Sequence, residues 1–204
     1  MSKNKESLIN QLTQKPWEPA QAKVDNLHVG KIGLRYIMVV STIMFCLFIV
    51  TYGDRMVYDD WVRMPEPFLL WINTLLLVIS SFVFIRIQLA SKKNNFEKAR
   101  RELFFIGFLA VLFLIGQLLV WQDLVQAGYY VSGSPANGYF YVFTTLHGFH
   151  LLGGLVYWVM TINKVWKLEN IIIRKAKHTI ELCAIYWHFL LAVWIVLFGL
   201  MLFS

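Results

Sequence analysis

Two histidines, His147 and His150, lie three residues apart within the apolar stretch 139-YFYVFTTLHGFHLLGGLVYWV-159. On an α-helix this spacing brings both imidazoles toward one face. Imidazole nitrogens bind metal ions and haem iron, and they also form hydrogen bonds between packed helices. A third histidine, His188, occurs in a later apolar stretch. The surrounding residues decide which of these roles is favoured.

Haem ligation normally needs two axial ligands that face each other across the iron. Since His147 and His150 share one helix, they cannot both bind one haem, and His188 would have to be the second ligand. A metal site would need further ligands, yet no carboxylate or cysteine lies beside the pair. Hydrogen bonding between helices needs neither a second axial ligand nor further metal ligands. The residues favour a structural role and leave haem or metal ligation as alternatives.

A proton or ion pathway through a membrane normally shows a carboxylate deep within a span. In this sequence Glu181 lies at the end of an apolar stretch, and Asp123 lies in a loop. This placement argues against transport by the chain alone.

The apolar residues gather in long blocks. The 204-residue sequence is 58% apolar and 15% charged, whereas globular chains average about 45–50% and about 25%. Five uncharged blocks approach the roughly 20 residues of a transmembrane helix. They are residues 36–52, 68–85, 103–121, 139–162 and 182–203. We therefore expect an all-α integral membrane bundle of five transmembrane helices over residues 31–204.

Polar segments surround these blocks. Residues 1–30 form a polar N-terminal leader, which we expect to be irregular or to lie along the membrane surface. Residues 128–138 contain Ser, Pro, Asn and Gly, a composition typical of a turn. The chain therefore has one membrane domain behind a cytoplasmic leader.

Basic residues predict the orientation. Seventeen of the 19 lysines and arginines lie in the leader and in the second and fourth loops, and the other two, Arg55 and Arg63, lie in the first loop. Cytoplasmic loops of membrane proteins carry this excess. The pattern predicts that the N-terminus lies in the cytoplasm and the C-terminus outside it. It also explains the net charge of +7 without nucleic acid binding.

Short motifs follow one another along the five blocks. In order they are Pro65 with Pro67, 73-NTLLLVISS-81, Gln117 with Trp121 and Gly128, 140-FYVFTTLHGFHLLGG-154, and Glu181 with 186-YWHF-189 and Trp194. Together they resemble subunit III of the haem–copper terminal oxidases (cytochrome c oxidase) in its five-helix bacterial form. The resemblance covers about residues 30–203.

This resemblance implies an accessory subunit without redox centres, in a complex that reduces oxygen to water. It also implies a bacterial inner membrane, with the C-terminus in the periplasm. Haem and copper would lie in partner subunits, with subunit I as the main contact and subunit II and a small subunit IV as further partners. Phospholipid would occupy a V-shaped cleft between the helices. Residues of the matched motifs would line or brace that cleft: Asn73, Gln117, His147, His150, Glu181, Tyr186, Trp187 and His188.

The sequence departs from the family pattern where many members carry membrane carboxylates, at Thr42, Val120 and Leu191. Lipid binding and stabilisation of a complex do not need those carboxylates. The electron donor (cytochrome c or quinol), the haem types and a larger assembly with a quinol-oxidising complex stay open. The alternative function, from another class, is a haem-b or quinone-linked membrane anchor of a different respiratory complex.

Overall fold

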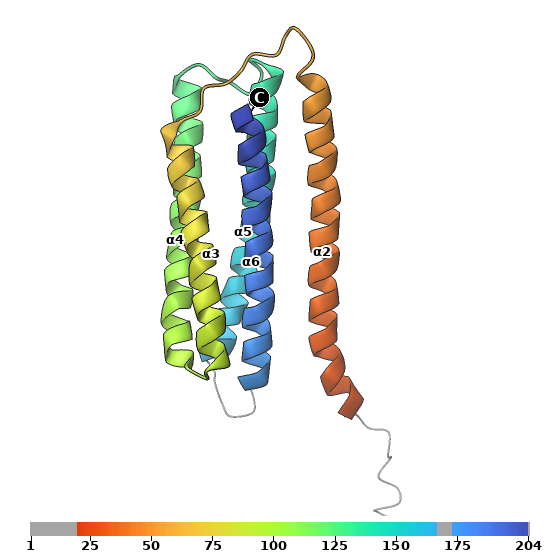
Figure 1. Cartoon of the computed structure of the whole chain (residues 1–204), viewed down its shortest axis with the longest axis vertical. Helices are drawn as coiled ribbons and strands as arrows, with labels where there is room; N and C mark the ends of the chain where they lie inside the picture. The colour runs from red at the N-terminus through yellow and green to blue at the C-terminus, as the bar shows by residue number, and fades with distance from the viewer. Residues whose placement is uncertain (1–19, 167–172, 204) are drawn as a thin grey trace, which may run out of the picture.

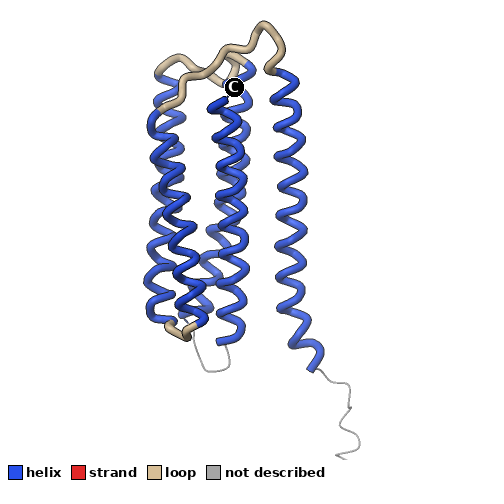
Figure 2. The backbone as a smooth tube through the Cα atoms, viewed as in Figure 1, coloured by secondary structure: helices blue, strands red, loops and turns tan. Residues whose placement is uncertain are grey.

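The computed structural model describes residues 20–166 and 173–203. Within these ranges the chain forms helices and no strands, and successive helices run in opposite directions (Figure 1, Figure 2). The helices are α2 (Ala20–Arg55), α3 (Phe68–Lys92), α4 (Phe96–Gln126), α5 (Pro135–Trp166) and α6 (Ile173–Phe203). All five are long and apolar enough to cross a membrane. The expected all-α fold with five membrane-spanning helices is confirmed.

The helices extend beyond the apolar blocks. α2 begins at Ala20, inside the leader that we expected to be irregular or interfacial, and α5 begins at Pro135, inside the expected turn region. Apolar composition marks the part of a helix that meets hydrocarbon, whereas backbone hydrogen bonds continue equally well through polar residues. The fixed φ of proline suits the first turn of α5. Residues 1–19 of the leader lie outside the described residues.

Four of the helices form a compact bundle, and α2 lies to one side of it (Figure 1). One hydrophobic core, containing Phe84, Leu103 and Trp187, fills the bundle of α3, α4, α5 and α6. A smaller cluster joins Phe45 and Tyr52 of α2 to α5 and α6. The bundle is therefore the main packing unit, and α2 is attached to it along a narrow strip.

Tight turns hold the bundle helices together at their ends. Asn94, between α3 and α4, has a φ of 58°, a left-handed conformation that asparagine tolerates. The side chain of Asn95 then caps α4 by accepting a hydrogen bond of 3.1 Å from a first-turn N–H. At the other end of α4, Gly128 has a φ of 89° and the next N–H, of Tyr129, donates to Leu124 O over 2.9 Å.

The outward faces of the helices are apolar. Large exposed hydrophobic side chains occur on every helix, among them Val40, Phe82, Phe108, Phe149 and Val196. Exposed apolar surface on this scale fits a surrounding bilayer rather than water. The start of α2 and the end of α6 lie at opposite ends of the structure (Figure 1), as an odd number of spans requires. Which end faces the cytoplasm stays a prediction.

Candidate functional site

Polar side chains within the spans pair across helices. Three hydrogen bonds join α6 to α3, each between an aromatic ring nitrogen of α6 and a hydroxyl of α3. The distances are 2.8 Å from Trp187 Nε1 to Ser80 Oγ, 3.0 Å from Trp194 Nε1 to Thr74 Oγ1, and 2.6 Å between His188 Nδ1 and Ser81 Oγ. These bonds fix the register of α6 along α3 and satisfy groups that would be costly to leave unpaired in hydrocarbon.

His150 joins α5 to α2. Its Nδ1 lies 2.7 Å from the carbonyl oxygen of Leu146, and its Nε2 lies 2.7 Å from Ser41 Oγ on α2. A carbonyl oxygen only accepts, so Nδ1 carries the proton and the Nε2 lone pair accepts from the serine hydroxyl. That lone pair is therefore engaged and not free for haem iron. The expected interhelical role is confirmed for His150 and for His188.

His147 contacts different helices from His150. Three residues along a helix place two side chains about 60° apart around the axis. In α5 this angle is enough for the two imidazoles to contact different helices. The imidazole of His147 is 0% exposed and packs between Phe113 of α4 and Trp194 of α6, at ring-centroid distances of 6.0 and 5.0 Å. Neither ring nitrogen has a hydrogen-bond partner among the described residues. The two imidazoles therefore lie on one side of α5, as expected, but contact different neighbouring helices.

Asn73 and Gln117 meet between α3 and α4. Asn73 Nδ2 donates a long hydrogen bond of 3.4 Å to Gln117 Oε1, and both side chains are buried. Gly116 makes the approach possible, because a Cβ at that position would overlap the Asn73 amide. The start of α3 and the end of α4 therefore pack closely around a polar contact.

The eight residues that the sequence singled out do not form one site. Tyr186 and Trp187 are buried, the former donating from its hydroxyl to the carbonyl oxygen of His150 over 3.0 Å. Glu181 is exposed near the start of α6, beside a hollow that Lys92 and Lys177 also line. The other seven residues lie in contacts between helices, and the predicted part of all eight in a lipid cleft stays a prediction. Among the described residues, no group of three or more His, Cys, Asp or Glu is arranged to hold a metal ion.

An apolar groove that sequence reasoning missed lies between α2 and α6. It is lined by Thr42, Phe45, Cys46, Ile49, Phe189, Ala192, Val193, Val196 and Leu197. Thr42 adds no free donor, because its hydroxyl donates to Met38 O of its own helix over 2.8 Å. Apolar residues on two spans carry no pattern that separates a groove from an ordinary lipid-facing surface, so the groove could not be predicted from the sequence.

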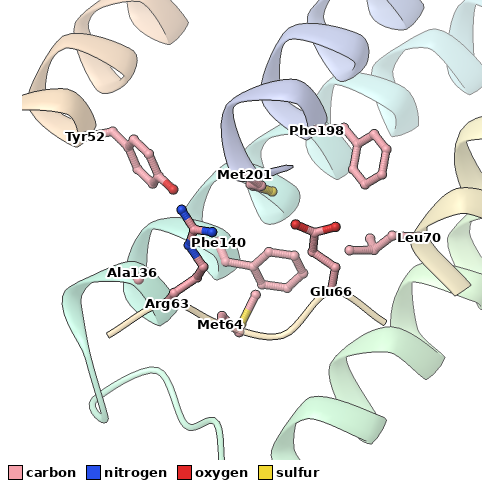
Figure 3. Close-up of a pocket in the computed structure, with 9 residues that line it drawn as sticks. All are labelled: Tyr52, Arg63, Met64, Glu66, Leu70, Ala136, Phe140, Phe198 and Met201. Atoms are coloured by element: carbon pink, nitrogen blue, oxygen red, sulfur yellow. The ribbon is translucent and has the colours of Figure 1, made fainter. Parts of the chain in front are cut away.

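A second pocket lies at the end of the bundle where α6 finishes (Figure 3). The loop between α2 and α3 crosses this end, and Ser134 Oγ accepts a hydrogen bond of 3.2 Å from the Val62 N–H. The Arg63 guanidinium points toward the Tyr52 hydroxyl, and the Glu66 carboxylate points into the same space (Figure 3). The loop therefore closes the bundle at this end.

Comparison with known proteins finds consistent relatives. A family model for cytochrome c oxidase subunit III matches residues 62–203, which include α3 to α6. The chain is 30% identical over 176 residues to cytochrome c oxidase subunit 3 of Thermostichus vulcanus, covering 83% of this chain and 85% of that protein. It is 32% identical over 126 residues to a probable cytochrome c oxidase subunit 3 of Nocardia farcinica, covering 62% and 61%. It is also 25% identical over 167 residues to cytochrome bo(3) ubiquinol oxidase subunit 3 of Buchnera aphidicola subsp. Baizongia pistaciae, covering 77% and 82%.

Proposed function

Because this multi-pass membrane chain belongs to the cytochrome c oxidase subunit III family, we propose that it is an accessory, non-redox subunit of a respiratory haem–copper oxidase in a bacterial inner membrane. It binds subunit I, with subunit II and a small subunit IV as further neighbours, and those partners carry haem and copper. The histidines support this proposal, since His150 and His188 are engaged in hydrogen bonds between helices.

Phospholipid binding is the second part of the proposal. The groove between α2 and α6 supports it, because an apolar hollow that opens to the bilayer fits an acyl chain. His150 and Trp187 brace the helices on either side of the groove through their bonds to α2 and α3. Lipid held there fills the space between α2 and the bundle and so stabilises the subunit within the complex.

Copurification tests the class of complex. The chain is extracted from its native membrane in mild detergent, and everything that accompanies it is identified by mass spectrometry. We expect a large multi-span oxidase subunit and a copper-domain subunit in equal amounts. Isolation of the chain alone, or with a flavin or iron–sulfur dehydrogenase, contradicts the proposal and favours the anchor alternative. The partner subunits also reveal whether cytochrome c or quinol is the electron donor.

A matched pair of variants tests the lipid groove. Ala192 is exposed and lines the groove, whereas Ile195 is exposed on α6 outside it. Ala192→Trp fills the groove, and we expect fewer phospholipid molecules per purified complex and a shorter working lifetime with normal initial turnover. Ile195→Trp adds a similar side chain on the same helix, and we expect it to leave the lipid content and the working lifetime unchanged. Equal lipid content in the two variants removes the groove as a lipid site.

The haem spectrum separates the proposal from the anchor alternative. His150→Ala removes the hydrogen bond to Ser41 and loosens α2, and the optical spectrum of the purified complex stays the same because no haem binds this chain. Loss of a haem band in this variant, with partner subunits present in normal amounts, overturns the assignment.

A further inference from the structure

Unpaired polar atoms gather in the interior of the bundle, away from the lipid groove. His147 Nδ1 and Nε2, Gln117 Nε2 and Asn73 Oδ1 are all inaccessible and without a hydrogen-bond partner among the residues that the structure describes. The three side chains are 0%, 5% and 1% exposed, respectively. Buried polar groups in folded proteins are paired with protein or with ordered water, so each of these atoms calls for a partner.

The register between α4 and α5 brings Gln117 to the level of His147. Phe113 of α4 packs on His147, and Trp121 Nε1 donates to Thr144 Oγ1 of α5 over 3.1 Å. Gln117 lies one helical turn from both Phe113 and Trp121 on the same face of α4. Gln117 therefore lies at the level of the turn of α5 between Thr144 and His147.

Contacts with α3 and α6 enclose the same layer. Asn73 donates to Gln117, and its Oδ1 faces the backbone of α4 at Gly116. On α6, Trp194 packs against His147 and donates its indole N–H to Thr74, the neighbour of Asn73. All four bundle helices thus contribute to one layer that combines aromatic rings with unpaired amide and imidazole atoms.

We propose that one or two water molecules bind in this layer, where they link the imidazole of His147 to the amides of Gln117 and Asn73. Buried waters occupy sites of this kind, where several otherwise unpaired polar atoms converge, and typically make about three hydrogen bonds each. The ligand is water itself, and the site is closed to lipid because His147 is wholly buried.

The donor and acceptor inventory favours water over a direct bond between side chains. A neutral imidazole has one N–H donor and one acceptor nitrogen on different edges of the ring, so one amide group cannot reach both. Water donates and accepts, and it can meet either edge. Exchanging the oxygen and nitrogen of the Asn73 or Gln117 amide changes which atom is unpaired but still leaves one unpaired.

Direct imaging of the whole oxidase complex tests the site. We expect a map that resolves ordered water to show density within hydrogen-bond distance of a His147 ring nitrogen and of the Gln117 or Asn73 amide. The density disappears in the His147→Phe variant. A map with well-defined side chains and no such density, or with the Gln117 amide bonded directly to the imidazole, overturns the proposal.

Thermal coupling between the variants gives a second measurement. If shared water links the two side chains, removing one partner already disrupts the network. The fall in melting temperature of the double variant His147→Phe/Gln117→Leu is then smaller than the sum for the single variants. The control is Thr161→Val with Gln117→Leu, because the Thr161 hydroxyl is fully buried but donates to Tyr157 O of its own helix. Additive shifts in both pairs contradict the shared water site.

Discussion

At the scale of single residues, glycines let large side chains of neighbouring helices come close. A Cβ at Gly107 on α4 would overlap the indole of Trp158 on α5, whose Nε1 donates to Leu103 O over 2.9 Å. At Gly154 on α5, a Cβ would lie 3.1 Å from the ring of Tyr186 on α6. Small residues at helix contacts in membranes have this effect, because they allow closer packing.

Gly107→Val tests this packing. The added side chain cannot coexist with the observed position of Trp158, so we expect the variant to destabilise the subunit by about 1–3 kcal/mol. The measurement is the temperature at which the chain dissociates from the purified complex. Gly148→Ala is the control, because a Cβ there meets nothing within 4 Å, and we expect its dissociation temperature to stay the same or rise. Equal stability of both variants contradicts the argument.

Residue types alone predicted part of this detail. An interhelical hydrogen-bonding role for buried histidines follows from the cost of unpaired polar groups in hydrocarbon, and His150 and His188 have that role. Their partners, Ser41 and Ser81, were not predictable, since serine is common in apolar helices and its partner depends on helix rotation. The different surroundings of His147 depend on the rotation of α5 in the same way.

At the scale of elements, the contact between α3 and α6 shows how hydrogen bonds set helix register. Trp187 and Trp194 lie two turns apart on α6, and each indole donates to a hydroxyl of α3. The aromatic rings also fill the core, with Trp187 packed on Phe84 at a centroid distance of 5.2 Å. Packing therefore stabilises the association of α3 and α6, and the hydrogen bonds select one register.

A double-mutant cycle on Trp187→Phe and Ser80→Ala measures the hydrogen-bond contribution. Phenylalanine keeps an aromatic ring but lacks the N–H, and we expect a coupling free energy of about 0.6 kcal/mol, typical of such bonds in membranes. Denaturant titration of the purified complex gives the four free energies. Thr51→Ala replaces Ser80→Ala in the control cycle, because Thr51 is exposed and bonds within α2. A coupling free energy of zero in the first cycle contradicts a direct role for the bond.

Hydropathy predicted the number and kind of elements but not their limits. The five uncharged blocks correspond to the five helices, yet α2 and α3 extend to Ala20 and Lys92. Hydropathy cannot find these ends, since a helix continues into the headgroup region with polar residues. The tight turn at Asn94 was likewise not predicted, although asparagine is one of the few residues suited to its positive φ.

At the scale of the whole molecule, the orientation in the membrane is the main prediction that is open to a direct test. Ser132 and Lys93 are both exposed, in loops at opposite ends of the structure. With cysteine at each position in turn, a membrane-impermeant maleimide should label Ser132→Cys in intact spheroplasts, and Lys93→Cys only after the membrane is opened. Labelling in the reverse pattern contradicts the positive-inside assignment.

Hydropathy predicted the number of helices but not how they are arranged. Lipid-facing and helix-facing residues are both apolar, so the composition of α2 does not show which of its faces contacts α5 and α6. The resemblance in ordered motifs identified the family, which the family model over residues 62–203 confirms. The positions of the motif residues within the bundle required the structure.

The loose attachment of α2 has a consequence for how the chain is made. Of the five described helices, α2 leaves the ribosome before the others, but its contacts, including Ser41 and Phe45 with His150, are to α5 and α6, which are made after α3 and α4. During most of translation α2 must therefore remain in the bilayer as an independent helix, stable through its own hydrophobicity and backbone hydrogen bonds. Its docking is a late step in biogenesis that waits for the rest of the polypeptide.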